Sequence, residues 1–129
     1  MENISIEIAH HLLHPEVATL RLKGFLYANT LPEFDKTLRT VIDAAKKKLI
    51  FDLSETTYIS SGGWSMFLVS LRRMKELGGD LILAGMTPEV HDAFELLEYD
   101  KVFKLFPSVD AALKQGFTSA VPNVAVSPA

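Results

Sequence analysis

Apolar and polar residues alternate at the start of the chain, a pattern typical of half-buried strands. Ile4, Ile6 and Ile8 carry the first alternation, and residues 17–23 carry a second one that ends at a glycine. We expect residues 10–15 to form the turn between these two strands. The sequence therefore predicts an N-terminal β-hairpin.

Further along the chain, the apolar positions change to helical spacing. The spacing predicts four helices, over residues 31–45, 60–77, 88–97 and 108–114. Thr30 and Thr87 stand where capping side chains are favoured, and we expect both to cap the helices that follow them. The lysines at 46–48 are expected to end the first helix, where cations suit its dipole.

Three short runs, over residues 49–53, 81–84 and 102–106, are almost continuously apolar, as in strands covered on both faces. Strands and helices alternate after the hairpin, an order that favours parallel neighbours and right-handed crossovers. We therefore predict an α/β fold with a mixed, mostly parallel β-sheet, about four helices and an N-terminal β-hairpin. Residues 1–117 should form this domain, and residues 118–129 should be a disordered tail.

Composition narrows the classes of function. The formal net charge of −3 disfavours nucleic acid, and also direct contact with a membrane, as the main interaction. The absence of cysteine excludes disulfides and thiolate chemistry. The chain start lacks the features of a secretory signal, and no apolar run approaches the ~20 residues that span a bilayer. We therefore expect a cytoplasmic protein.

The segment Ser60-Ser61-Gly62-Gly63 begins a predicted helix, and Asp52-Leu53-Ser54, a few residues earlier, ends a predicted buried strand. The start of a helix offers free N–H groups and a positive dipole end, which favour a bound phosphate. Two glycines leave the approach to this corner open. A serine here is therefore a candidate phosphorylation site, although the same pattern also fits a serine that only caps the helix.

Three segments resemble the STAS family, typified by bacterial anti-sigma factor antagonists. They are Leu-Ile-Phe-Asp-Leu-Ser over 49–54, Tyr-Ile-Ser-Ser-Gly-Gly over 58–63 and Leu-Gly-Gly-Asp-Leu-Ile-Leu-Ala-Gly over 77–85. The resemblance covers roughly residues 4–115. It implies the STAS fold and places the family's phosphorylated serine on Ser61, with Ser60 as second choice. Ser60 itself stands where the family has an aspartate, and Tyr27 stands in the place of another.

The resemblance implies regulation of transcription by partner switching. The protein would bind an anti-sigma factor that is also a serine kinase. Phosphorylation of Ser61 would weaken that complex, and a phosphatase would restore it. The chemistry would belong to the partners, so this chain is expected to be no enzyme and to need no cofactor or metal.

The expected partner-binding surface joins the switch segment to the outer side of the helix that follows it. Its residues are Tyr27, Asn29, Ser60, Ser61, Gly62, Gly63, Ser65, Met66, Val69, Arg72 and Arg73. Met66 and Val69 fit a binding surface or the edge of the core equally well. Trp64 is expected in the core.

Other functions remain open or are disfavoured. One alternative is a STAS scaffold module of a stress-signalling complex that is never phosphorylated, and another is the small cytoplasmic STAS subunit of an ABC lipid transporter. His10, His11 and His14 lack convincing partners for a metal site. A hydrolase with Ser61 as nucleophile and His91 as base lacks the expected glycine-flanked elbow and a third orienting group.

Overall fold

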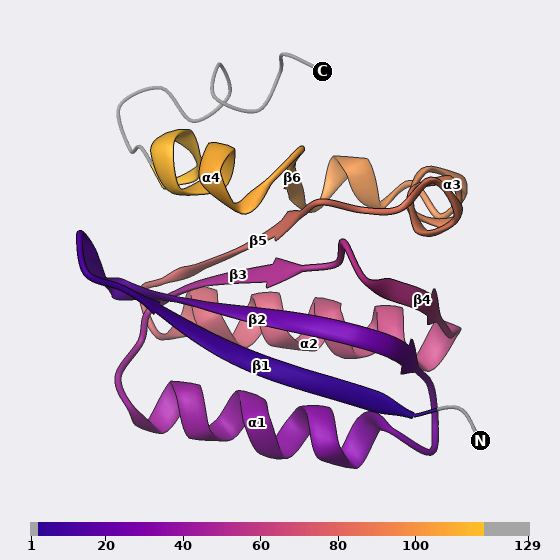
Figure 1. Cartoon of the computed structure of the whole chain (residues 1–129), viewed down its shortest axis with the longest axis horizontal. Coiled ribbons are helices and arrows are strands. Elements are labelled where there is room, and N and C mark those ends of the chain that lie inside the picture. Colours follow the sequence, from indigo (N-terminus) through magenta and orange to yellow (C-terminus); the bar gives the residue numbers. More distant parts are fainter. Residues whose placement is uncertain (1–2, 118–129) are drawn as a thin grey trace.

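The computed structural model describes residues 3–117, which fold into one mixed sheet with helices on both faces (Figure 1). The strands are β1 (Ile4–His11), β2 (His14–Leu26), β3 (Lys48–Asp52), β4 (Thr56–Ile59), β5 (Asp80–Ala84) and β6 (Lys104–Phe106). The sheet order is β1-β2-β3-β5-β6, and β4 pairs with the last part of β2. β1 is antiparallel to β2, and the other pairs are parallel. The predicted hairpin and the mostly parallel sheet are confirmed.

Helices cover the two faces of the sheet unequally. They are α1 (Leu31–Asp43), α2 (Ser61–Glu76), α3 (Pro88–Leu96) and the short α4 (Val109–Ala111), which continues as a π-helical turn over Ala112–Gly116. α1 and α2 lie on one face, and α4 lies over β5 and β6 on the other (Figure 1). On that second face, β1 and β2 carry mainly charged and polar side chains, among them Glu7, Arg21 and Lys23, while Val17 of β2 joins the core under α4.

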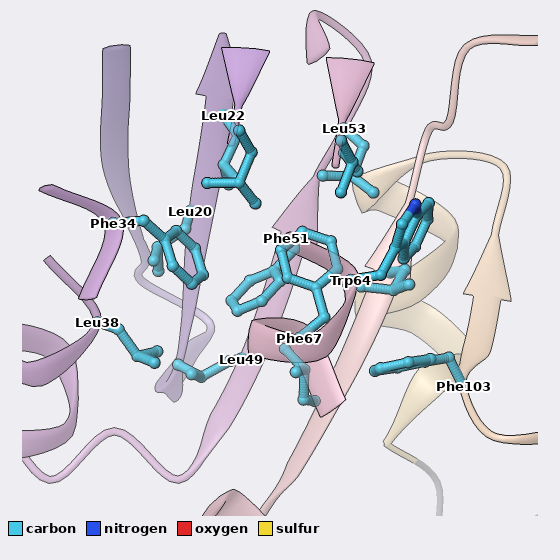
Figure 2. Packing of buried hydrophobic residues seen from close by; sticks show 14 of the residues in the cluster. Leu20, Leu22, Phe34, Leu38, Leu49, Phe51, Leu53, Trp64, Phe67 and Phe103 are labelled. Carbon is cyan, nitrogen blue, oxygen red and sulfur yellow. The ribbon is translucent and has the colours of Figure 1, made fainter. Parts of the chain in front are cut away.

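The main core lies between the sheet and helices α1, α2 and α3. Phe51 of β3 is its centre, with ring centroids 5.4 Å from Phe34 and 4.9 Å from Phe67 (Figure 2). Trp64 extends this cluster to Tyr99, 5.4 Å away. A smaller core under α4 contains residues from alternate positions of β3 and β5. Both strands are thus buried on both faces, as their continuous apolar runs predicted.

The structure corrects the predicted hairpin. Its strands are longer than expected, because β1 continues to His11 and β2 begins at His14. The turn is therefore only Leu12–Leu13. β2 also continues past Gly24, whose φ of 109° accompanies a register shift in its pairing with β4. β4 itself was not predicted.

The predictions around α1 were wrong in two places. The Thr30 side chain does not cap the helix, because its hydroxyl donates to Phe25 O and accepts from Tyr27 N instead. α1 ends at Asp43, and the chain reverses through Ala45 with a φ of 63°. The lysines at 46–48 therefore follow the helix rather than end it.

The later elements match the sequence more closely. Thr87 caps α3 through a hydrogen bond that its hydroxyl accepts from Val90 N at 3.3 Å. The helix predicted over residues 88–97 ends at Leu96, and Leu97 is 46% exposed. β6 is shorter than predicted and leaves Val102 exposed. Within residues 3–117, no helix has the length and apolar character needed to cross a bilayer. The predicted tail over 118–129 lies outside the described residues.

Candidate functional site

Ser60 ends the segment that leads out of β4 and acts as the N-cap of α2. Its backbone is extended, with φ −76° and ψ 170°, and its hydroxyl oxygen accepts a hydrogen bond from Gly63 N at 3.1 Å. Its carbonyl accepts the first helical bond, from Trp64 N at 2.9 Å. The side chain and the carbonyl of Ser60 are therefore both committed to starting the helix.

Ser61 is the first residue of α2 and its side chain is exposed. In the part of the chain that the structure describes, no hydrogen bond holds its hydroxyl. The N–H groups of Ser61 and Gly62 have no intrahelical acceptor, because they belong to the first turn. That turn also contains no acidic residue. The corner can therefore accept negative charge at the hydroxyl without disturbing α2.

The two glycines after Ser61 differ in what they contact. A Cβ added to Gly62 would lie 3.5 Å from Leu31 Cδ1, an ordinary contact. A Cβ added to Gly63 would lie 2.8 Å from Ile59 Cγ2 and 3.1 Å from Leu26 O. Gly63 is buried, so its small size lets α2 pack closely against β2 and β4.

The loop between β2 and α1 forms the other side of this corner. Ser60 N donates to Leu26 O at 2.9 Å, which places the following residues, Tyr27 and Asn29, beside the start of α2. The Asn29 amide donates to the Tyr27 hydroxyl at 3.5 Å. The fold thus brings together two of the predicted surface segments that lie more than 30 residues apart in the sequence.

The residues predicted on the outer side of α2 are not equally available. Ser65, Val69 and Arg72 are exposed, and Val69 is 42% exposed. Met66 and Arg73 are partly buried, and Met66 packs against the main core. Of the two apolar candidates, Val69 therefore belongs to the surface and Met66 to the core edge.

Sequence reasoning missed Tyr58, an aromatic side chain close to the corner. It lies on β4, three residues before Ser61, and is 52% exposed. The β-branched and aromatic run over 56–59 was the signal for that strand. An exposed aromatic residue beside a candidate switch adds contact area that a protein partner can bury.

The first of the three sequence segments has a structural explanation. Asp52 is buried at the end of β3, and its carboxylate accepts from Arg21 Nε at 3.1 Å and from Ser54 N at 3.0 Å. These bonds fix the turn that leads from β3 to β4. The Asp-Leu-Ser sequence therefore orients the turn into β4, the strand that leads to Ser60 and Ser61. The aspartate itself lies at the base of that turn.

The histidines form neither the metal site nor the hydrolase site that the sequence raised as possibilities. His11 Nε2 lies 2.8 Å from Thr19 Oγ1, and its pKa is lowered from 6.5 by burial and by His14 and His10. Metal ions are usually held by His, Cys, Asp or Glu side chains. Among residues 3–117, one group of three such residues has its donor atoms within 4.8 Å of one another: His91, Asp92 and Glu95 on α3, which are largely exposed.

His91 does not form a catalytic pair with Ser61 in the described structure. Its Nδ1 lies 3.7 Å from a Glu95 carboxylate oxygen, and its ring packs near Phe94. No hydrogen bond joins it to Ser61 within residues 3–117. The geometry therefore gives no support to a hydrolase.

In this small α/β domain, an antiparallel hairpin leads into a parallel sheet, and a serine lies at a helix start on one rim of that sheet. The model of the STAS domain matches residues 11–112, so the chain belongs to the STAS family.

Individual relatives are similar over most of the chain. BtrV of Bordetella bronchiseptica, named as an anti-sigma factor antagonist, is 26% identical over 102 residues, covering 79% of this chain and 87% of its own. An anti-sigma factor antagonist from Mycobacterium paratuberculosis shares the fold with a TM-score of 0.76 at 22% identity, covering 86% and 92%. The Bacillus cell fate determinant SpoIIAA, in its phosphorylated form, shares it with a TM-score of 0.66 at 16% identity, covering 87% and 99%.

Proposed function

We propose that this protein is an anti-sigma factor antagonist that regulates transcription by partner switching, with Ser61 as the switch residue. The observation that carries the proposal is that two neighbouring serines have different structural roles. Ser60 is held as the helix cap, whereas the Ser61 hydroxyl is exposed at the first position of α2. A kinase can therefore reach Ser61 without unfolding the helix start.

Similarity to named proteins supports this proposal. BtrV and the Mycobacterium paratuberculosis protein both carry the name of anti-sigma factor antagonist. SpoIIAA, which shares the fold, is known in a phosphorylated form. The reported relatives favour an antagonist over a transporter subunit.

Phosphorylation of Ser61 would change the contact with the partner and would leave the fold of this chain unchanged. The Ser61 hydroxyl would attack the γ-phosphorus of ATP bound to the partner kinase, ADP would leave, and the proton would pass to the kinase or to water. The new phosphate would add about −1.5 to −2 charge at neutral pH. Because it would lie at the positive end of α2, this charge would be tolerated by the helix and felt mainly by the partner.

The partner would bind around this corner. We propose the residues of the predicted surface as its contacts, centred on Tyr27, Asn29, Ser61 and Gly62 and extended along α2 by Ser65 and Val69. Arg72 lies about 16 Å from Ser61 along the helix axis, so it would mark the outer limit of the contact. A phosphatase would hydrolyse the phosphoserine and restore binding. The antagonist would work in the cytoplasm and would need no cofactor.

The experiment is phosphorylation of purified variants by the cognate anti-sigma factor kinase with ATP, followed by intact-mass analysis. The unmodified protein and Ser60→Ala should each gain one phosphate, whereas Ser61→Ala should gain none. Binding of the kinase to unphosphorylated Ser61→Ala should remain, which shows that this variant is folded. Incorporation into Ser61→Ala at the unmodified rate would overturn the assignment.

A second candidate is a STAS scaffold module that is never phosphorylated. One observation favours it: Ser60 and Tyr27 occupy positions beside Ser61 where a carboxylate would help to engage a kinase. Intact-mass analysis of protein isolated from its native cell under several growth conditions separates the two functions. A scaffold would carry no phosphate in any of them.

A further inference from the structure

The turn of the β1–β2 hairpin exposes two leucines. Leu12 is 99% exposed and Leu13 is 89% exposed, more than any other large apolar side chain among the described residues. They form a two-residue loop between His11 and His14, which face each other across the hairpin. Loops of this length favour Asn, Asp and Gly. Leu12 and Leu13 both keep a negative φ, so this turn does not require those residue types. Neither leucine belongs to either core, so core packing does not explain them.

Basic residues surround the base of this tip. Lys46 Nζ donates a hydrogen bond to Pro15 O, and Lys48 is paired in register with Val17 of β2. Lys47, between them, is exposed. The hairpin itself adds His10, His11 and His14. An apolar tip is thus followed by a belt of cationic and titratable side chains.

Two of the acidic groups at this end, Glu16 and Asp80, are paired with lysines. Glu16 lies 3.7 Å from Lys48 Nζ. Asp80 accepts from Lys104 Nζ at 3.0 Å and lies 3.3 Å from Lys75 Nζ.

Asp43 and Glu76, which end α1 and α2 at the same side of the sheet, are exposed and form no ion pair among the described residues. The lysines nearest the tip are Lys46 and Lys47, and neither is paired with a carboxylate within residues 3–117.

The charge of the chain is distributed unevenly between its two ends. Helix α3 packs against β4 near the switch corner. Four exposed carboxylates lie on α3 or just after it, on Glu89, Asp92, Glu95 and Glu98. The tip and the corner lie at opposite ends of β2, whose 13 residues span roughly 40 Å (Figure 1). The net charge of −3 is a sum over the whole chain, so it does not describe the local charge at the tip.

We propose that the hairpin tip docks on an anionic phospholipid surface. Leu12 and Leu13 would enter the boundary between headgroups and acyl chains, and Lys46 and Lys47 would meet the lipid phosphates. A convex tip of only two apolar residues suits a soft, extended layer, because it needs no preformed pocket. This departs from the absence of direct membrane contact expected from composition, and it leaves the Ser61 corner facing away from the lipid.

The test is sedimentation of the full chain with vesicles of phosphatidylcholine alone or of phosphatidylcholine mixed with phosphatidylglycerol. The protein should sediment with the anionic vesicles, and high salt should reduce that binding. Leu12→Ser/Leu13→Ser, which removes both apolar side chains at a turn of negative φ, should weaken vesicle binding by roughly tenfold or more. Lys47→Glu should weaken it as well.

Two variants serve as controls. Leu96→Ser removes another highly exposed leucine, 84% exposed on α3, and should bind vesicles like the unmodified protein. Ser61→Ala should also bind normally, so this test is independent of the switch. Buried Trp64 reports by its fluorescence that each variant is folded. The proposal is overturned if the protein ignores anionic vesicles, binds neutral ones equally, or keeps its binding in the tip variant.

Discussion

The hydroxyl oxygen of Ser60 lies 3.1 Å from the backbone nitrogen of Gly63, and this single bond distinguishes two adjacent serines. It closes the first turn of α2 and removes the Ser60 oxygen from the surface chemistry of the corner. Ser61, one residue further, projects into solvent. Whether a serine at this corner stabilises the fold or presents a hydroxyl to a partner therefore depends on which side of the helix boundary it occupies.

The first prediction compares the two serines in stability. Ser60→Ala should lower the free energy of unfolding by about 1 kcal/mol, because Gly63 N loses its capping acceptor. Ser61→Ala should change it by less than about 0.5 kcal/mol, because the side chain is exposed at the helix surface. Urea unfolding followed by Trp64 fluorescence measures both. Equal losses for the two variants would contradict the assignment of Ser60 as the cap.

The second prediction compares the two glycines. Gly63→Ala should destabilise the protein by about 1–3 kcal/mol, because the new methyl group would press on Ile59 and on the carbonyl of Leu26. Gly62→Ala should be neutral or stabilise by up to about 1 kcal/mol, since its methyl group has room and alanine favours the helix. Thermal unfolding of the pair checks this. A loss at Gly62 as large as that at Gly63 would show that the glycines share one role.

The sequence predicted the main elements well wherever burial alone determined the pattern. β3 and β5 are covered on both faces, so their apolar runs were unambiguous. β4 was missed because it has only four residues, and its two central side chains, Thr57 and Tyr58, are exposed. A strand so short has too little alternation to be distinguished from a loop.

The error at Thr30 has a local cause. Thr30 occupies a capping position, yet its hydroxyl donates to Phe25 O at the end of β2 and accepts from Tyr27 N of the loop that follows. These partners are only three and five residues away in the sequence, but the bonds depend on how the chain turns from β2 into α1, which helix-capping preference alone does not predict. The candidate corner was located correctly as a helix start, but the packing role of Gly63 depends on Leu26, which lies 37 positions earlier in the sequence. That contact exists only once β2 and β4 have paired.

The third prediction concerns the buried carboxylate of Asp52. Arg21→Met should cost on the order of 1–2 kcal/mol, because it leaves a nearly buried charge with one fewer donor, although water reaches the exposed half of the arginine. Lys23→Met is the matched control, since Lys23 pairs with the exposed Glu7 at 3.2 Å, and it should cost less than about 0.5 kcal/mol. Chemical denaturation compares the two. Equal costs would mean that Asp52 does not depend on Arg21.

The fourth prediction concerns pH and the hairpin. Burial, with His14 and His10, lowers the pKa of His11 below 6.5 in the folded protein, so the unfolded chain takes up this proton first as the pH falls. The stability associated with neutral His11 is therefore complete above about pH 7 and is lost as the pH falls through 6.5 toward the folded pKa. Below that folded pKa the loss stops growing, because both states are then protonated.

His11→Gln should flatten this part of the pH dependence, because glutamine can still bond to Thr19 but does not titrate. Free energies of unfolding measured for both proteins between about pH 7.5 and 5.5 give the two slopes. The slope of the unmodified protein should be steeper, and the difference should be confined to the region below about pH 7. Parallel curves for the two proteins would show that His11 is equally easy to protonate in the folded and unfolded chains.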